Sequence, residues 1–273
     1  MTIEDRDPIL NSRATINPYR TAAGLILDRL GWDLNPESWR SRVRLNAVRD
    51  SYKGERAVIL CNGPSLNRVD FDLLKGVFCF GLNKINLLFD RSSFRPDAVV
   101  AVNRLVIEQN AAFFNSTDLP LFISKVGLGQ VRPRRSANVP RFARDVSISC
   151  YEGHTVTYVA LQLAFHMGFR QVALVGADHT FASKGPANKT VIAGDVDESH
   201  FDPRYFSGGV KWQLPDLFQS EVAYTMARDS YAAFGGRVVN ATDGGQLEVF
   251  DRMDLATFVS PAGPAPESIS AGT

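Results

Sequence analysis

Six short apolar runs constrain the fold of this chain more than any other feature of its sequence. They occupy residues 57–61, 77–80, 98–102, 121–123, 171–175 and 237–240. Hydrophobicity that is continuous rather than alternating is typical of a strand buried on both faces, as in a parallel sheet. The sequence therefore predicts a mostly parallel sheet with helices packed on both of its faces.

Helical patterns lie between and before these strands. Residues 155–167 predict a helix between the fourth and fifth strands, and Gly168 ends it. Two further helices are predicted ahead of the first strand, over residues 21–30 and from Pro36 to about Tyr52. Short strands that alternate with helices indicate the α/β class.

The chain divides by composition into three parts. We expect an N-terminal helical extension over residues 1–52 and one α/β domain over residues 53–259. Residues 260–273 are rich in Pro, Ala, Gly and Ser, which predicts a disordered tail.

The charge balance argues against a dedicated nucleic-acid-binding protein. Lys and Arg total 30 and Asp and Glu total 29, which gives a net charge of +1. Proteins that bind nucleic acid usually carry a clear basic excess. The arginine-rich segment 132–144 is interpreted as a solvated loop, and it could also meet a lipid-linked acceptor.

The N-terminal residues and the cysteines indicate the cellular compartment of the protein. The first residues are polar and acidic, unlike a signal peptide, and no segment has the roughly 18 uninterrupted apolar residues that a membrane span needs. Cys61, Cys79 and Cys150 are an odd number without C-x-x-C spacing, so we interpret them as buried thiols. These features predict a cytoplasmic protein.

Polar residues follow several predicted strands at the point where each strand ends. These residues are Asn62, Asn83, Asn103 and Asp178, and Asn240 is a fifth candidate. Ligands of open α/β sheets bind beyond the carboxyl ends of the strands. An asparagine side chain offers a donor and an acceptor for nucleotide hydroxyls and base edges, although asparagine is also common in turns.

The turn Asn62-Gly63-Pro64-Ser65-Leu66 is the strongest local signal. Gly63 allows a backbone to approach a phosphate closely, and Ser65 can cap a helix while its hydroxyl reaches the ligand. Free N–H groups at a helix start form a natural anion site. The turn is neither a G-x-G-x-x-G fingerprint nor a P-loop. Gly153 and Thr155 open the next helix and form a second possible cradle, or an ordinary N-cap.

Two histidines are candidates for proton transfer. His179 directly follows Asp178 at a strand end, and His200 lies in the long polar stretch 182–212, which has the length of a lid. An exposed loop histidine without a catalytic role is an equally good interpretation of His200. The acidic residues around it lack a recognisable metal-ligand spacing.

The order of these motifs resembles the MptE-like family. That family includes archaeal 6-hydroxymethyl-dihydropterin diphosphokinases and motility-associated Maf glycosyltransferases, and it is similar in fold to the bacterial family-42 sialyltransferases. The resemblance rests on the turn 62–66, Gly81-Leu82-Asn83, Val102-Asn103, residues 155–164 and Gly176-Ala177-Asp178-His179. It extends from about Trp39 to about Asp254.

The resemblance implies a Rossmann-like fold and a nucleotide site. Asn62 and Ser65 match the residues that hold cytidine nucleotide in the sialyltransferases, and Asn83 and Asn103 match later strand-end asparagines. His200 with Tyr205 is the nearest counterpart of the sialyltransferase base and its neighbouring tyrosines, although the spacing does not match. Cys61 replaces a glycine of the sialyltransferase turn.

Three functions remain open on these residues. The favoured one is glycosyl transfer from a nucleotide sugar, in which His200 or His179 deprotonates an acceptor hydroxyl and Ser65 with backbone N–H groups holds the leaving phosphate. The second is diphosphoryl transfer from ATP, with Mg²⁺ on Asp178. The third is a non-catalytic nucleotide- or sugar-binding protein. The expected partners are a nucleotide donor, which is a substrate rather than a tightly bound cofactor, and a small-molecule or glycan acceptor.

Overall fold

The computed structural model describes residues 18–124, 141–182 and 185–260. Its centre is a seven-stranded sheet in the order β4-β3-β2-β1-β5-β8-β9, and every neighbouring pair is parallel. The strands are Arg56–Leu60 (β1), Phe78–Leu82 (β2), Ala98–Ala101 (β3), Leu121–Ile123 (β4), Gln171–Val175 (β5), Arg237–Asn240 (β8) and Asp251–Arg252 (β9). The predicted α/β class is confirmed, and the architecture is consistent with a Rossmann-like fold.

The apolar runs are continuous because both faces of the sheet are covered. In β1, Ala57 and Ile59 belong to one buried cluster, whereas Val58 and Leu60 belong to the cluster on the opposite face. Successive side chains of a strand point to opposite faces, so a strand between two layers needs apolar residues at every position.

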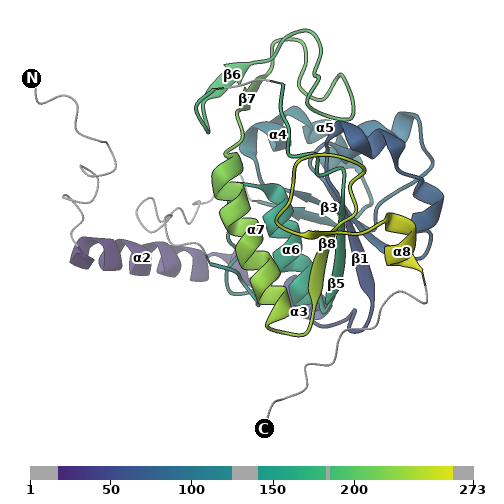
Figure 1. Ribbon diagram of the computed structural model, residues 1–273. Helices are drawn as coiled ribbons and strands as arrows, with labels where there is room; N and C mark the ends of the chain where they lie inside the picture. The colour runs from purple at the N-terminus through teal and green to yellow at the C-terminus, as the bar shows by residue number, and fades with distance from the viewer. Residues whose placement is uncertain (1–17, 125–140, 183–184, 261–273) are drawn as a thin grey trace, which may run out of the picture.

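Helices and 3₁₀ turns form the two covering layers (Figure 1). The helices α6 (Val156–Met167) and α7 (Leu217–Ala232) contribute to one cluster. The other layer contains α4 (Arg104–Gln109), α5 (Ala111–Ser116), α8 (Leu255–Val259), η1 (Pro64–Arg68), η2 (Phe71–Leu74) and η3 (Ile85–Asp90). The prediction of helices on both faces is therefore confirmed.

The helix α6 begins and ends where the sequence predicts. The Thr155 side chain caps it by accepting a hydrogen bond from Thr157 N, and Gly168 ends it with a φ of 104°. Left-handed backbone of this kind favours glycine at a helix end.

The strand order reverses beside β1. The chain first builds β1 to β4 toward one edge, and α6 then carries it across to β5, which pairs with the other side of β1. In open α/β sheets, ligands bind beyond the carboxyl ends of the strands at such a point.

The connection from β5 to α7 contains a small antiparallel pair that the sequence did not predict. Its strands are β6 (Thr190–Ile192) and β7 (Lys211–Gln213). Figure 1 shows this hairpin beyond the carboxyl edge of the main sheet, next to the start of α7.

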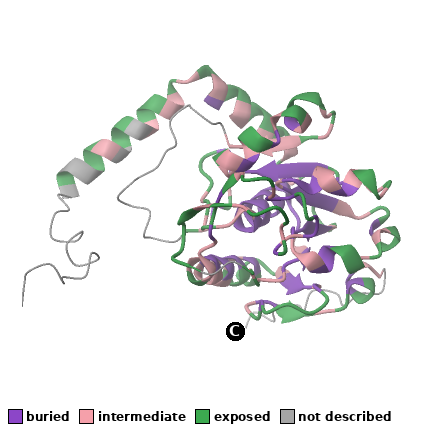
Figure 2. Ribbon diagram, turned by 90° about the horizontal axis from the view of Figure 1, so that it is seen from above, coloured by how far each residue is buried: buried purple, intermediate pink, exposed green. Residues whose placement is uncertain are grey.

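Two helices precede the sheet, α2 (Pro18–Asp33) and α3 (Pro36–Val48). The end predicted for α3, at about Tyr52, is wrong by four residues. Asp50 adopts a left-handed φ of 56°, and its N–H donates to the His166 carbonyl at the end of α6 instead of continuing the helix. In both Figure 1 and Figure 2, α2 leads away from the body of the domain.

One cysteine prediction is also wrong. Cys61 and Cys79 are buried, but Cys150 is exposed, because it lies in the irregular segment before α6 rather than on a strand. Within the described ranges, no helix is both long and apolar enough to cross a bilayer. The arginine cluster at 132–135 and the tail from 261 lie outside the described residues.

Candidate functional site

The turn after β1 and the turn after β5 are bonded to each other at the carboxyl edge of the sheet. Ser65 Oγ donates to Asp178 Oδ2 at 2.6 Å, and Ser65 N lies 3.2 Å from the same oxygen. Gly63 N donates to the Gly176 carbonyl at 2.9 Å. The carboxylate of Asp178 thus accepts hydrogen bonds from the Ser65 hydroxyl and N–H, which the sequence analysis had assigned to a ligand phosphate.

Glycine is required at position 63. A Cβ there would lie 2.0 Å from Asp178 Oδ2 and 2.7 Å from the Gly176 carbonyl oxygen. The capping role predicted for Ser65 is wrong, because Pro64 starts the 3₁₀ turn and the N-cap position falls on Gly63, which has no side chain to offer.

Two buried acceptors remain at the ends of the neighbouring strands β1 and β2. They are Asn62 Oδ1 and Asn83 Oδ1, and neither has a hydrogen-bond partner among the described residues. Buried polar atoms nearly always have a partner, and a carbonyl oxygen without one costs about 1–3 kcal/mol. A ligand that donates hydrogen bonds at both positions would remove this cost.

The other strand-end asparagines are used by the protein. Asn103 Oδ1 accepts from Leu105 N at 2.9 Å and thereby caps α4. Asn240 donates to the Leu247 carbonyl at 2.8 Å and accepts from Thr242 N at 3.0 Å. All the predicted asparagines therefore lie at the carboxyl edge, but the two on β1 and β2 alone keep a buried oxygen unpaired.

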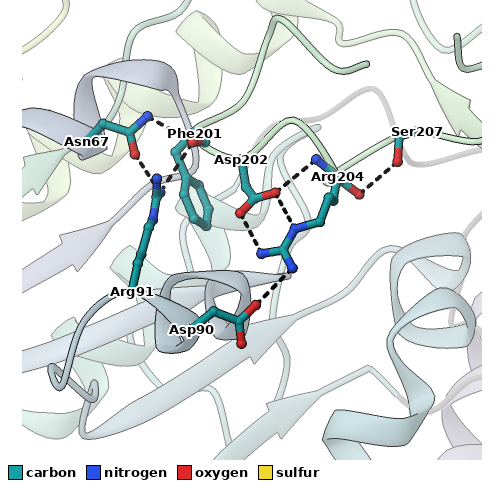
Figure 3. A network of polar contacts seen from close by, with 7 residues as sticks. All are labelled: Asn67, Asp90, Arg91, Phe201, Asp202, Arg204 and Ser207. Carbon is teal, nitrogen blue, oxygen red and sulfur yellow. Dashed lines mark hydrogen bonds and ion pairs between the residues drawn. The ribbon is translucent and has the colours of Figure 1, made fainter. Parts of the chain in front are cut away.

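The segment 197–206 crosses the carboxyl ends of β1 and β2. Phe201 N donates to the Asn62 carbonyl at 2.9 Å, and the Phe201 carbonyl accepts from Asn67 Nδ2 at 2.8 Å. Figure 3 shows Arg204 holding the same segment, with its guanidinium between Asp202 at 2.9 Å and Asp90 at 2.8 Å. These bonds fix the segment against the carboxyl edge of the sheet.

This segment carries a histidine–carboxylate pair. His200 Nδ1 lies 2.8 Å from Asp197 Oδ2, and both side chains are largely buried. The His200 ring stacks on the Tyr205 ring with parallel planes and centroids 4.0 Å apart. When Nδ1–H is donated to the carboxylate, Nε2 retains the lone pair, which is the arrangement of a general base.

Asp197 is held as a carboxylate. Burial raises its pKa, but hydrogen bonds from His200, from Ser199 N at 2.8 Å and from Phe206 N at 3.0 Å lower it, and the net pKa lies below the ordinary value. An ionised Asp197 fixes both the tautomer and the orientation of the imidazole.

Tyr205 connects the pair to β2. Burial raises the pKa of its phenol well above the ordinary value, while the Asn83 side chain and the Lys84 backbone N–H donate hydrogen bonds to its oxygen. The hydroxyl therefore stays protonated and keeps its own hydrogen for donation.

Lys84 is a site residue that the sequence analysis missed. Its ammonium donates to the Tyr205 carbonyl at 2.6 Å and to Gln109 Oε1 at 2.9 Å, beneath the rings of Tyr205 and Phe206. Burial lowers the pKa of Lys84 to about 8, against an opposing effect of Asp197. Its position directly after Asn83 indicated that it lies near the candidate site, but a lysine at a strand end is ordinarily solvated.

The remaining candidates lie on the α6 and α7 side. His179 Nε2 is 3.0 Å from Glu221 Oε1, and its ring centroid is 6.3 Å from that of Tyr224. Thr155 Oγ1 lies 3.3 Å from the Tyr224 hydroxyl. Gly153 has a φ of 55°, and a Cβ there would lie 2.2 Å from the Tyr158 ring, so packing explains this glycine.

No group of three or more His, Cys, Asp or Glu side chains is arranged to hold a metal ion within the described part of the chain. Asp178, which a magnesium-dependent reaction would use, directs Oδ2 at the Ser65 hydroxyl.

A hollow of about 600 Å³ lies at the opposite, amino edge of the sheet. Tyr52, Phe78, Phe94 and Phe122 are among its lining residues. The candidate site is assigned to the carboxyl edge nevertheless, because the unpaired acceptors and the histidine–carboxylate pair gather there.

Comparison with known proteins gives a distant likeness. No family model matches the chain, and no curated protein matches it. A solved structure of a Maf glycosyltransferase from Magnetospirillum magneticum AMB-1 is similar at a TM-score of 0.45 and 14% identity. The alignment covers 80% of this chain and 38% of the other, so this chain spans about two fifths of that protein. A likeness at this level carries no argument about this chain.

Proposed function

We propose that this protein is a glycosyltransferase that uses a nucleotide-activated sugar, in surface glycan or glycoconjugate synthesis, with His200 as its general base. The observation that carries the proposal is the His200–Asp197 pair, held at 2.8 Å on a segment whose backbone is bonded to Asn62. A base oriented by a carboxylate at the ligand-binding edge of an α/β sheet suits the deprotonation of an acceptor hydroxyl.

The reaction forms one bond and breaks one. His200 Nε2 takes the proton of the acceptor hydroxyl, and the acceptor oxygen bonds to the anomeric carbon of the donor sugar. The bond between that carbon and the phosphate oxygen breaks, and the nucleotide leaves with the electron pair. Asp197 stabilises the imidazolium that forms.

The nucleoside end of the donor is assigned to Asn62 and Asn83. Their unpaired oxygens require hydrogen-bond donors, which ribose hydroxyls and exocyclic amines supply and phosphate oxygens do not. A cytidine monophosphate donor, with an amine on its base and two ribose hydroxyls, is the first to test.

The leaving phosphate is assigned to the backbone N–H groups at the start of α6, next to Thr155. The hydroxyl of Ser65 is directed at Asp178, so this assignment replaces the direct phosphate contact that the sequence suggested for Ser65. Tyr205 is almost fully buried and supports the His200 ring on which it stacks.

The test is a thermal-shift panel of CMP, CDP, UDP, GDP and ATP, each with and without Mg²⁺. Ligand at about 100 times its dissociation constant adds about 2.7 kcal/mol, which raises Tm by several degrees. We expect stabilisation by CMP without metal. It should fall to about half in Asn62→Ala, because tenfold weaker binding leaves about 1.4 kcal/mol, and it should be unchanged in Asn46→Ala, a matched control on the exposed face of α3.

Other outcomes replace the proposal. Stabilisation by ATP only with Mg²⁺ would move the assignment to diphosphoryl transfer, which pyrophosphorylation of 6-hydroxymethyl-dihydropterin would then check. A third outcome is that a nucleotide stabilises the protein but its sugar conjugate is never turned over. If this holds for the parent protein and for His200→Ala alike, the chain is a binding protein.

A further inference from the structure

Lys84 holds Tyr205 at both of its ends. The ammonium of Lys84 donates to the Tyr205 carbonyl at 2.6 Å, and the Lys84 backbone N–H donates to the Tyr205 hydroxyl. The Asn83 side chain donates to the same hydroxyl. One residue at the end of β2 therefore contacts both the backbone and the phenol of the tyrosine on which the His200 ring stacks.

The Lys84 ammonium also reaches the helix and the hairpin on the same side of the sheet. It donates to Gln109 Oε1 of α4 at 2.9 Å, and Gln109 Nε2 donates to the Lys211 carbonyl of β7 at 2.7 Å. Residues 197–206 lie between β6 and β7 in the chain. The bonds that start at Lys84 thus hold the hairpin and the segment that carries His200 against one strand end.

The burial of Lys84 is costly for the fold. Only 6% of the residue is exposed, and both acceptors that bond its ammonium are neutral groups. Burial lowers the pKa of Lys84 to about 8, and Asp197 offsets this effect only in part. A methionine would lie beneath the rings of Tyr205 and Phe206 without burying a charge. The geometry that Lys84 imposes explains its presence better than stability does.

We propose that Lys84 is a positioning residue, which fixes the Tyr205 ring and, through that ring, the orientation of the His200 imidazole. The bond to Asp197 holds one atom of the imidazole, and the stacked Tyr205 ring holds its plane. The expected effect on turnover rests on the proposed function, whereas the expected effect on the His200 ring does not.

The first test observes the His200 ring by NMR. The chain has four histidines, so their imidazole signals can be assigned by single substitutions. At pH 7, where Lys84 is charged, Lys84→Met should shift the His200 signals, because a stacked aromatic ring strongly affects the resonances of protons that face it. The signals of the other three histidines should stay in place. Lys189→Met, the same substitution at an exposed residue before β6, is the matched control and should shift none.

Kinetics provide the second test. Lys84→Met should lower kcat by up to about 100-fold, because a displacement of about 1 Å at a reacting group costs about that much. The KM for the donor and the affinity for CMP should stay within about threefold of the parent values, because Lys84 does not contact the Asn62 side chain. Lys84→Gln, which keeps a neutral donor, should recover part of kcat.

Gln109→Leu tests the second bond of the ammonium. It removes the link to Lys211 and leaves the bond to the Tyr205 carbonyl, so kcat should fall less than in Lys84→Met. The double variant should be no slower than Lys84→Met alone, because the two residues act along one chain of bonds. If Lys84→Met does not fold, Lys84→Gln and Gln109→Leu provide the same readouts.

Two results would overturn the proposal. One is a folded Lys84→Met protein in which the His200 signals do not move, whether or not the parent protein transfers a sugar. The other is a loss of kcat that is matched by equal losses of CMP affinity and thermal stability, which would make Lys84 a purely structural residue. A parent protein without transferase activity, in which Lys84→Met still shifts the His200 signals, would remove the proposed function and support the role of Lys84 in orienting the ring.

Discussion

The two edges of the parallel sheet are built from the same strands yet differ in how their polar atoms are satisfied. At the amino edge, a hollow of about 600 Å³ is lined by rings such as Tyr52 and Phe78, and Asp97 Oδ2 accepts from Cys79 N at 2.7 Å. At the carboxyl edge, buried oxygens of Asn62 and Asn83 lack partners among the residues that the structure describes. The candidate site was therefore chosen by its strand-end asparagines and its histidine–carboxylate pair rather than by volume.

The largest effect expected at the carboxyl edge belongs to the proposed base. His200→Ala should lower the rate of glycosyl transfer by about 10²- to 10⁴-fold, because general-base catalysis contributes about that much. Nucleotide affinity should stay within about threefold, which isothermal titration measures. His154→Ala, a half-exposed histidine 3.7 Å from Asp216, is the matched control. If His179→Ala abolishes turnover and His200→Ala does not, the base lies on the α7 side.

A change at the amino edge should affect stability and not binding. Phe78 packs against Tyr52, Phe80 and Phe169 at centroid distances of 4.8, 4.9 and 5.1 Å. Phe78→Ala should reduce the free energy of unfolding by about 2–4 kcal/mol in urea titration while leaving nucleotide affinity unchanged. Phe218→Ala, which removes a ring that is 71% exposed, should have little effect. Loss of nucleotide affinity in Phe78→Ala would show that the two edges are coupled.

The smallest effect on stability is expected from the unpaired asparagine. Asn62→Ala removes a buried acceptor that has no partner among the described residues, so the free energy of unfolding should change by less than about 1 kcal/mol. Nucleotide affinity should fall about tenfold, the value of one lost hydrogen bond. Asn240→Ala is the contrast, because it leaves the Leu247 carbonyl and the Thr242 N–H without their partner. It should lower the free energy of unfolding by about 1–3 kcal/mol without weakening nucleotide binding.

The sheet was predictable because a strand buried on both faces has a continuous run of apolar residues in the sequence. The six apolar runs correspond to β1, β2, β3, β4, β5 and β8, whereas the two-residue β9 is too short to leave one. The helix α7 escaped prediction for a related reason. Its buried positions are Ser220, Ala223, Tyr224, Ala227 and Tyr231, which are mostly small or polar and form no clear apolar stripe.

The position of the candidate residues at one edge of the sheet was predictable, but their hydrogen bonds were not. Parallel strands bring their carboxyl ends together, so Asn62, Asn83 and Asp178 were expected to share one edge. That Ser65 donates to Asp178 depends on a contact 113 positions apart in the chain. The burial of Lys84 likewise depends on a loop 121 positions later. Such pairings follow from the register of the sheet, which a local pattern does not encode.

Asn62 joins two parts of the site through different atoms. Its side-chain oxygen is the unpaired acceptor, and its backbone carbonyl accepts the hydrogen bond from Phe201, next to His200. Under the proposed function, the donor and the segment that carries the base would therefore be held by one residue. A substitution that shifts the backbone at position 62 would then disturb donor binding and the position of His200 together.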